Sequence, residues 1–142
     1  MEEILGVVAL VVGKLRRVFV IRYKNIYLLA QDLSEDFSND WIYLNVSKWS
    51  VDPKNTEVFI INEDWLIDLQ VDMPELVVNN SKSEVIPIEC GDVEIETFIE
   101  VQTLEGVVIN IKKSKKDFDF DLLVKAINYY REYDDFLEQE SI

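Results

Sequence analysis

An uninterrupted apolar stretch near the N-terminus constrains the fold of this chain more than any other feature. Residues Ile4–Val12 read ILGVVALVV, nine residues without a polar side chain. Four valines and Gly6 are unfavourable in a helix, so the stretch is predicted to be a β-strand covered on both faces. It is about half as long as a bilayer span and follows two glutamates, so it predicts neither a transmembrane helix nor a signal peptide.

Further short runs of strand-forming residues follow, separated by turn residues. The predicted strands are Arg17–Tyr23, Ile26–Ala30, Trp41–Val46, Glu57–Ile61 and Glu84–Glu89. Between them, residues 47–56 contain proline and asparagine and are expected to form a loop. A short helix capped by Asn62 is expected to end at Pro74.

The segment Asp92–Lys113 is predicted to be a β-hairpin. Its first half, DVEIETFIEV, alternates apolar and acidic residues, which is typical of a half-buried strand. Pairing Val101 with Val107 keeps the apolar residues of both halves on one face and places Glu96 opposite Lys112. Phe98 then lies in the outer row of glutamates, and it belongs to the core only if the C-terminal helix covers that row.

A final helix is predicted from a cap at Asp119 to about Gln139, because apolar residues recur there at helical spacing. The 142 residues fit one domain, residues 1–142. We therefore predict an α+β fold, with a mostly antiparallel sheet of about six strands and the C-terminal helix packed on one face.

Several chemistries need residues that this chain lacks. It has no histidine, one cysteine (Cys90) and four glycines, at positions 6, 13, 91 and 106. These exclude histidine-based catalysis and metal sites, a cysteine-ligated zinc or iron–sulfur site in a monomer, and glycine-rich phosphate loops. We predict a protein that is not an enzyme, with no catalytic residues, no metal and no cofactor. An acid-only hydrolase with two carboxylates in a cleft stays open as an alternative.

Two acidic motifs begin like known sites without completing them. DFDFD at residues 117–121 matches the start of a calcium loop, but Leu122 replaces the required glycine and Asn128 the required glutamate. DPK at residues 52–54 has the carboxylate-to-lysine spacing of some metal nucleases, but its proline predicts a turn. We therefore interpret the first motif as carboxylates at a helix start and the second as a turn.

The charge of the chain is strongly negative and unevenly distributed. Its net charge is −14, with 28 acidic and 14 basic residues. Residues 1–31 carry +3, whereas residues 32–142 carry −17. Such a surface repels nucleic-acid phosphate and anionic lipid and attracts basic proteins, so we expect a basic protein partner, no nucleic acid and no membrane. The simpler interpretation is that the acidity keeps the protein in solution.

These observations lead to the hypothesis of a small cytoplasmic inhibitor of the immunity or antitoxin type, which neutralises a basic, nuclease-like toxin domain by occupying its cationic surface. The lone cysteine suits a reducing compartment. An aromatic ringed by carboxylates is typical of an interface hot spot. The predicted partner-binding residues are Glu63, Asp64, Trp65, Asp68, Glu94, Phe98 and Glu100.

The alternative hypothesis is a structural or regulatory subunit of a larger assembly, including phage and mobile-element proteins. In that case the apolar N-terminal strands form the interface of a homo-oligomer, and the acidity serves solubility alone. The sequence leaves the oligomeric state and the strand order open.

Overall fold

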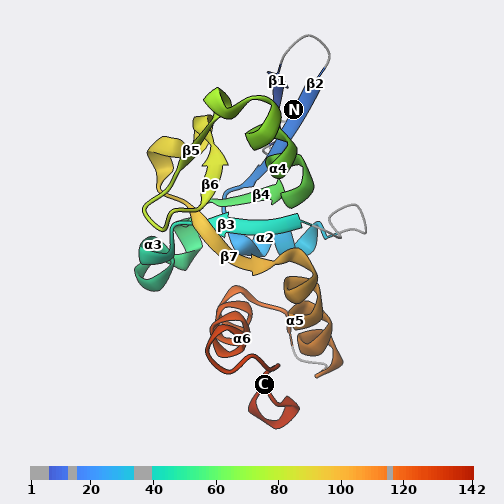
Figure 1. Cartoon of the computed structure of the whole chain (residues 1–142). Helices are drawn as coiled ribbons and strands as arrows, with labels where there is room; N and C mark the ends of the chain where they lie inside the picture. The colour runs from blue at the N-terminus through green and yellow to red at the C-terminus, as the bar shows by residue number, and fades with distance from the viewer. Residues whose placement is uncertain (1–6, 13–15, 34–39, 115–116) are drawn as a thin grey trace.

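The computed structural model describes residues 7–12, 16–33, 40–114 and 117–142 (Figure 1). The main sheet is antiparallel, has five strands in the order β1-β2-β4-β3-β7, and is accompanied by a two-stranded sheet, β5-β6. The strands are β1 Val7–Val12, β2 Arg16–Tyr23, β3 Asp40–Leu44, β4 Val58–Asn62, β5 Val77–Asn79, β6 Val85–Pro87 and β7 Glu96–Glu100. The helices are α2 Ile26–Gln31, α3 Val46–Val51, α4 Glu63–Asp72, α5 Val101–Lys113 and α6 Phe120–Tyr133.

Four 3-10 turns complete the described structure: η2 Pro53–Asn55, η3 Pro74–Leu76, η4 Ile88–Val93 and η5 Gln139–Ser141. The predicted α+β class, the antiparallel sheet and the packing of the C-terminal helix on one face are confirmed. Residues 4–6 of the predicted first strand lie outside the described residues.

The central strands β3 and β4 have buried side chains on both faces, with α4 and the β5-β6 sheet on one side and α2 and α5 on the other (Figure 1). Ile42 and Ile60 point into one core, which they share with α2, α3, α5 and α6. Tyr43 and Phe59, one position away, point into a second core with Leu66 of α4 and the β5-β6 sheet. Successive side chains of a strand point to opposite faces, so the run of apolar residues in β4 is explained by two covering layers.

Two segments predicted as strand and loop are helical. Ile26–Ala30 belongs to α2, where the Asn25 side chain accepts a hydrogen bond of 3.0 Å from the Leu28 amide and caps the helix. Its buried residues are Ile26, Leu29 and Ala30, a helical spacing that five residues are too few to distinguish from a strand. Residues 47–56 hold α3, capped in the same way by Asn45, and η2.

The predicted hairpin at Asp92–Lys113 is wrong. β7 pairs with β3, and the chain enters α5 directly after Glu100. The buried residues of α5 recur at helical spacing and are Val101, Leu104, Val107, Val108 and Ile111. The apolar residues expected to lie on a second strand therefore form one side of a helix, and the predicted pairing of Glu96 with Lys112 does not occur.

A β-bulge determines where Phe98 lies. Ile42 pairs with Ile99 while Tyr43 pairs with Thr97, so Phe98 is the extra residue on β7. Phe98 and Ile99 consequently both belong to the core with α5 and α6, and Phe98 is only 7% exposed. Alternation along β7 breaks at this residue, which is why the sequence pattern placed Phe98 in the outer row.

The final helix begins as predicted and ends early. The Asp119 side chain accepts a hydrogen bond of 2.8 Å from the Leu122 amide and caps α6. The helix stops at Tyr133 because Asp134 adopts a left-handed conformation, with φ 56°. The C-terminal segment, residues 134–142, then packs back on α5, where the Asn110 side chain donates from Nδ2 to the Leu137 carbonyl over 2.8 Å.

Gly106, inside α5, leaves room for the Phe136 ring of the C-terminal segment to pack against this helix. Replacing Gly106 gives a first prediction. A Cβ at position 106 would lie 2.8 Å from Cζ of Phe136. Gly106→Ala should raise helix propensity by about 1 kcal/mol but displace the Phe136 ring, so the wild-type background gains no stability. In a Phe136→Ala background the same change should stabilise by about 1 kcal/mol in urea unfolding. Equal effects in both backgrounds would show that the contact has no energetic weight.

Candidate interaction surface

The helix α4 continues β4 without an intervening loop. β4 ends at Asn62 and α4 begins at Glu63. The Asn62 side chain accepts a hydrogen bond of 2.9 Å from the Trp65 amide, and its Nδ2 donates to Asp40 over 2.7 Å. The predicted cap is confirmed, and Glu63 and Asp64 occupy the first turn, where the helix dipole favours carboxylates.

The inner side of α4 is apolar. Leu66 and Leu69 are buried. Trp65 is partly buried and packs against the second core and against a small separate cluster around Leu69. Its indole N–H is buried without a hydrogen-bond acceptor among the described residues. Trp65 therefore lies on the inner side of α4, against the core, and is not the exposed aromatic residue that we expected.

The outer side of α4 combines acidic residues with exposed apolar ones. Ile67 is 51% exposed and Val71 is 74% exposed. Residues four apart are neighbours on a helix, so these two side chains form one small apolar strip. Three exposed acids flank the strip, and no basic side chain of the described residues forms an ion pair with them. We call this surface the acidic α4 face; it comprises Glu63, Asp64, Ile67, Asp68 and Val71.

The sequence contained a signal for Ile67 and Val71 that our prediction did not use. Once Trp65, Leu66 and Leu69 are assigned to the buried side of a helix, the two remaining apolar residues fall on the opposite side. Apolar residues on the side of a helix that faces away from the core form exposed apolar surface.

Glu100 lies at the same end of the sheet as the start of α4. In the sheet, Trp41 of β3 pairs with Ile61 on one side and with Glu100 on the other. Two strand spacings, about 10 Å, therefore separate Glu100 from the β4 backbone. Asp40 lies at this end too, where burial raises the pKa of its carboxyl although the hydrogen bond from Asn62 opposes the rise.

Glu94 and Phe98 are not brought to this surface. Glu94 is exposed and follows η4 in a left-handed conformation, with φ 50°, at the opposite end of β7 from Glu100. Phe98 is a core residue: its ring meets Trp49 edge-to-face at 4.9 Å and lies under the Arg131 guanidinium at 4.4 Å. The predicted patch of Glu94, Phe98 and Glu100 is therefore wrong for Phe98, because the helical layer covers that side of the bulge.

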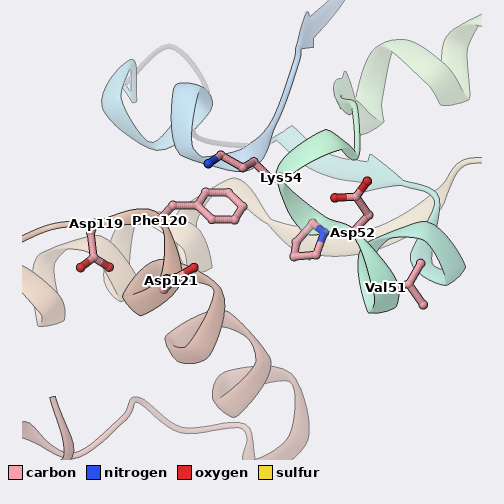
Figure 2. Close-up of a pocket in the computed structure, with 7 residues that line it drawn as sticks. Val51, Asp52, Lys54, Asp119, Phe120 and Asp121 are labelled. Atoms are coloured by element: carbon pink, nitrogen blue, oxygen red, sulfur yellow. The ribbon is translucent and has the colours of Figure 1, made fainter.

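The two acidic motifs of the sequence line one surface hollow of about 440 Å³ (Figure 2). Figure 2 shows Asp52 and Asp119 on opposite sides of the Phe120 ring. Asp52 accepts hydrogen bonds of 3.0 and 3.1 Å from the Asn55 side chain, and Asp119 caps α6. In the described ranges, no three acidic or cysteine side chains are grouped so that they could hold a metal ion.

Comparison with known proteins identifies one family. A family model described as a domain of unknown function (DUF7716) matches residues 26–139, from the start of α2 to the C-terminal segment. No curated protein and no solved structure matches the chain. The matched region contains the acidic α4 face and leaves β1 and β2 outside. None of the described helices has the length and apolar character needed to cross a membrane.

Proposed function

The chain belongs to the DUF7716 family of domains of unknown function, and we propose that it is a non-catalytic binding protein that takes a basic protein partner on the acidic α4 face. The observation that carries this proposal is the exposed pair Ile67 and Val71, set among the carboxylates of Glu63, Asp64 and Asp68. Solubility alone accounts for the carboxylates. An apolar pair set among charged side chains is also the combination from which a small protein interface is built, with an apolar centre and a polar rim.

The two kinds of side chain supply different parts of binding. Exposed carboxylates attract a cationic surface from a distance and accelerate its encounter, an effect that salt screens. The apolar pair supplies contact energy, because covering a largely exposed Ile or Val side chain is worth about 1–2 kcal/mol. A partner that fits this face presents lysine or arginine side chains around a small apolar patch.

In its most specific form, the proposal is an immunity or antitoxin-type inhibitor acting in the cytoplasm on a nuclease-like toxin domain. Nucleases bind phosphate through basic clefts, and a helix bearing spaced carboxylates is suited to occupy such a cleft. The buried thiol of Cys90, whose pKa burial raises to about 11, suits a compartment in which cysteines stay reduced.

The test is to search the genes beside this one for a basic nuclease domain and to measure the association of the purified chain with it. Stopped-flow measurement at several ionic strengths should show an on-rate that falls steeply as salt rises. Nuclease activity should be lost at a one-to-one ratio of the two proteins. An on-rate independent of ionic strength would overturn the proposed role of the acidic α4 face.

Paired substitutions separate the two contributions and form our second prediction. Asp64→Asn with Asp68→Asn should lower the on-rate by about 3- to 10-fold at low salt and leave the off-rate nearly unchanged. Ile67→Ser with Val71→Ser should instead raise the off-rate by about 10- to 100-fold.

The matched control changes the net charge by the same amount elsewhere. Glu138 and Glu140 are exposed in the C-terminal segment, and Glu138→Gln with Glu140→Gln should alter the on-rate by less than about 2-fold. If this control lowers the on-rate as much as the α4 pair does, the attraction is a property of the whole molecule and not of this face.

A further inference from the structure

The β1-β2 ribbon extends beyond the strand that anchors it to the sheet (Figure 1). β1 pairs with β2 along its whole length, from Val7 to Val12. β4, on the other side of β2, pairs only with Ile21, Arg22 and Tyr23. β1 is an end strand of the described sheet, so along its outer edge no described strand accepts or donates backbone hydrogen bonds.

This outer edge carries none of the residues that usually protect an exposed strand. Edge strands avoid unwanted pairing through charged residues, prolines, bulges or short length. β1 reads VVALVV, with no charge, no proline and no glycine, and its pairing with β2 is regular over six residues. A two-stranded ribbon is marginally stable on its own. The strand is therefore suited to pairing with a further strand.

The sequence of β1 favours its own copy as that further strand. In a fully overlapped antiparallel pair, Val7 of one chain is opposite Val12 of the other, and Val8 is opposite Val11. Ala9 is opposite Leu10, so the smallest residue meets the largest. Cross-strand pairs of β-branched residues are favourable, and a two-fold axis makes every pair occur twice.

The charge distribution directs self-association to the same place. Residues 32–142 carry −17, so two copies repel one another through most of their surface. Residues 1–31 carry +3, and β1 itself is uncharged. We propose that two copies of this chain pair antiparallel through the outer edges of their β1 strands and join their sheets into one. This dimer does not depend on the acidic α4 face, so either proposal can fail alone.

The mass of the full chain in solution tests the proposal. Light scattering after size exclusion should give a dimer of the 16.6 kDa chain that persists in molar salt, because no charge holds it together. Ala9→Lys introduces two positive charges at the two-fold axis and should weaken the dimer at least about tenfold. The control is Val51→Lys on α3, an equal change of charge at a side chain that is 81% exposed, which should remain dimeric.

Disulfide cross-linking tests the register and guards against misfolding of the lysine variant. In a Cys90→Ala background, chains with Ala9→Cys and chains with Leu10→Cys should form a covalent dimer when mixed and oxidised, since opposite residues have Cα atoms about 4.5–5.5 Å apart. Either chain alone should form much less. A monomeric wild-type chain, a dimeric Ala9→Lys variant, or equal cross-linking in mixed and unmixed samples would each overturn the proposal.

Discussion

Trp49→Ala should lower the free energy of unfolding by about 4 kcal/mol, the largest effect that we expect from one substitution. Trp49 lies on α3 and is 3% exposed. Its ring packs against Phe98, and its indole N–H donates to Oδ1 of Asn128 on α6 over 2.8 Å. The substitution removes both the ring and the connection between α3 and α6. Urea unfolding followed by circular dichroism measures the change.

Two further variants divide this effect. Trp49→Phe keeps an aromatic ring and loses the hydrogen bond, so it should cost about 1–2 kcal/mol. Ser50→Ala is the control on the same helix, because its exposed hydroxyl donates to the Val46 carbonyl one turn earlier, and it should change stability by less than about 0.5 kcal/mol. A cost of Trp49→Ala below that of Trp49→Phe would contradict the packing described here.

Glu84→Ala should lower the free energy of unfolding by about 3 kcal/mol at neutral pH. The Glu84 carboxylate accepts hydrogen bonds from the Thr97 amide at 3.0 Å, from the Thr97 hydroxyl, and from the Asn80 side chain at 2.8 Å. Asn80 also donates to the Ile95 carbonyl, so these residues connect the β5-β6 sheet to β7. Removing the carboxylate leaves three donors without their acceptor.

The same site should make stability depend on pH. Burial by itself would raise the pKa of Glu84, but the hydrogen bonds from Thr97 and Asn80 outweigh it and lower the pKa below the ordinary value of 4.5. A carboxylate with a lowered pKa contributes stability above the unfolded-state value, and that stability is lost as pH falls through the folded-state value.

Glu84→Gln isolates this effect of charge. Its deficit relative to wild type should be largest above pH 4.5 and should shrink in more acidic solution. Glu89→Gln, at an exposed residue of η4, is the control and should show a small deficit without that trend. A Glu84→Gln deficit that stays constant down to the acid transition would exclude the proposed ionised acceptor.

The fold class could be predicted from local sequence patterns. The errors arose where contacts between distant segments determine the secondary structure. Strands β3, β4 and β6 and the capped starts of α4 and α6 matched prediction because their signals are contained within a few residues. α5 did not: its valines and isoleucines suit either a strand or a helix, and the alternating run just before it, residues 93–101, offered a plausible hairpin partner. The actual partner of β7 is β3, whose paired residues lie 52 to 59 positions earlier, a distance that local pairing rules do not reach.

The candidate surface was predicted only in part. Glu63, Asp64 and Asp68 share the outer side of α4, as their capped helix implied. Trp65 is partly buried because α4 packs its inner side on the second core. Phe98 is in the core because the β-bulge at this residue points it toward the helical layer. Glu100 joined the same end of the sheet through strand pairing that is not visible in the sequence.

The direct passage from β4 into α4 has a consequence for binding. No flexible linker separates the helix from a central strand whose Ile60 and Ile61 are fully or almost fully buried. The helix therefore cannot rotate or shift without disturbing the sheet, and its side chains are preorganised before any partner arrives. Such a surface loses little conformational entropy on association. Its free and bound backbones should superimpose within about 1 Å, so adaptation to different partners would have to come from the partner.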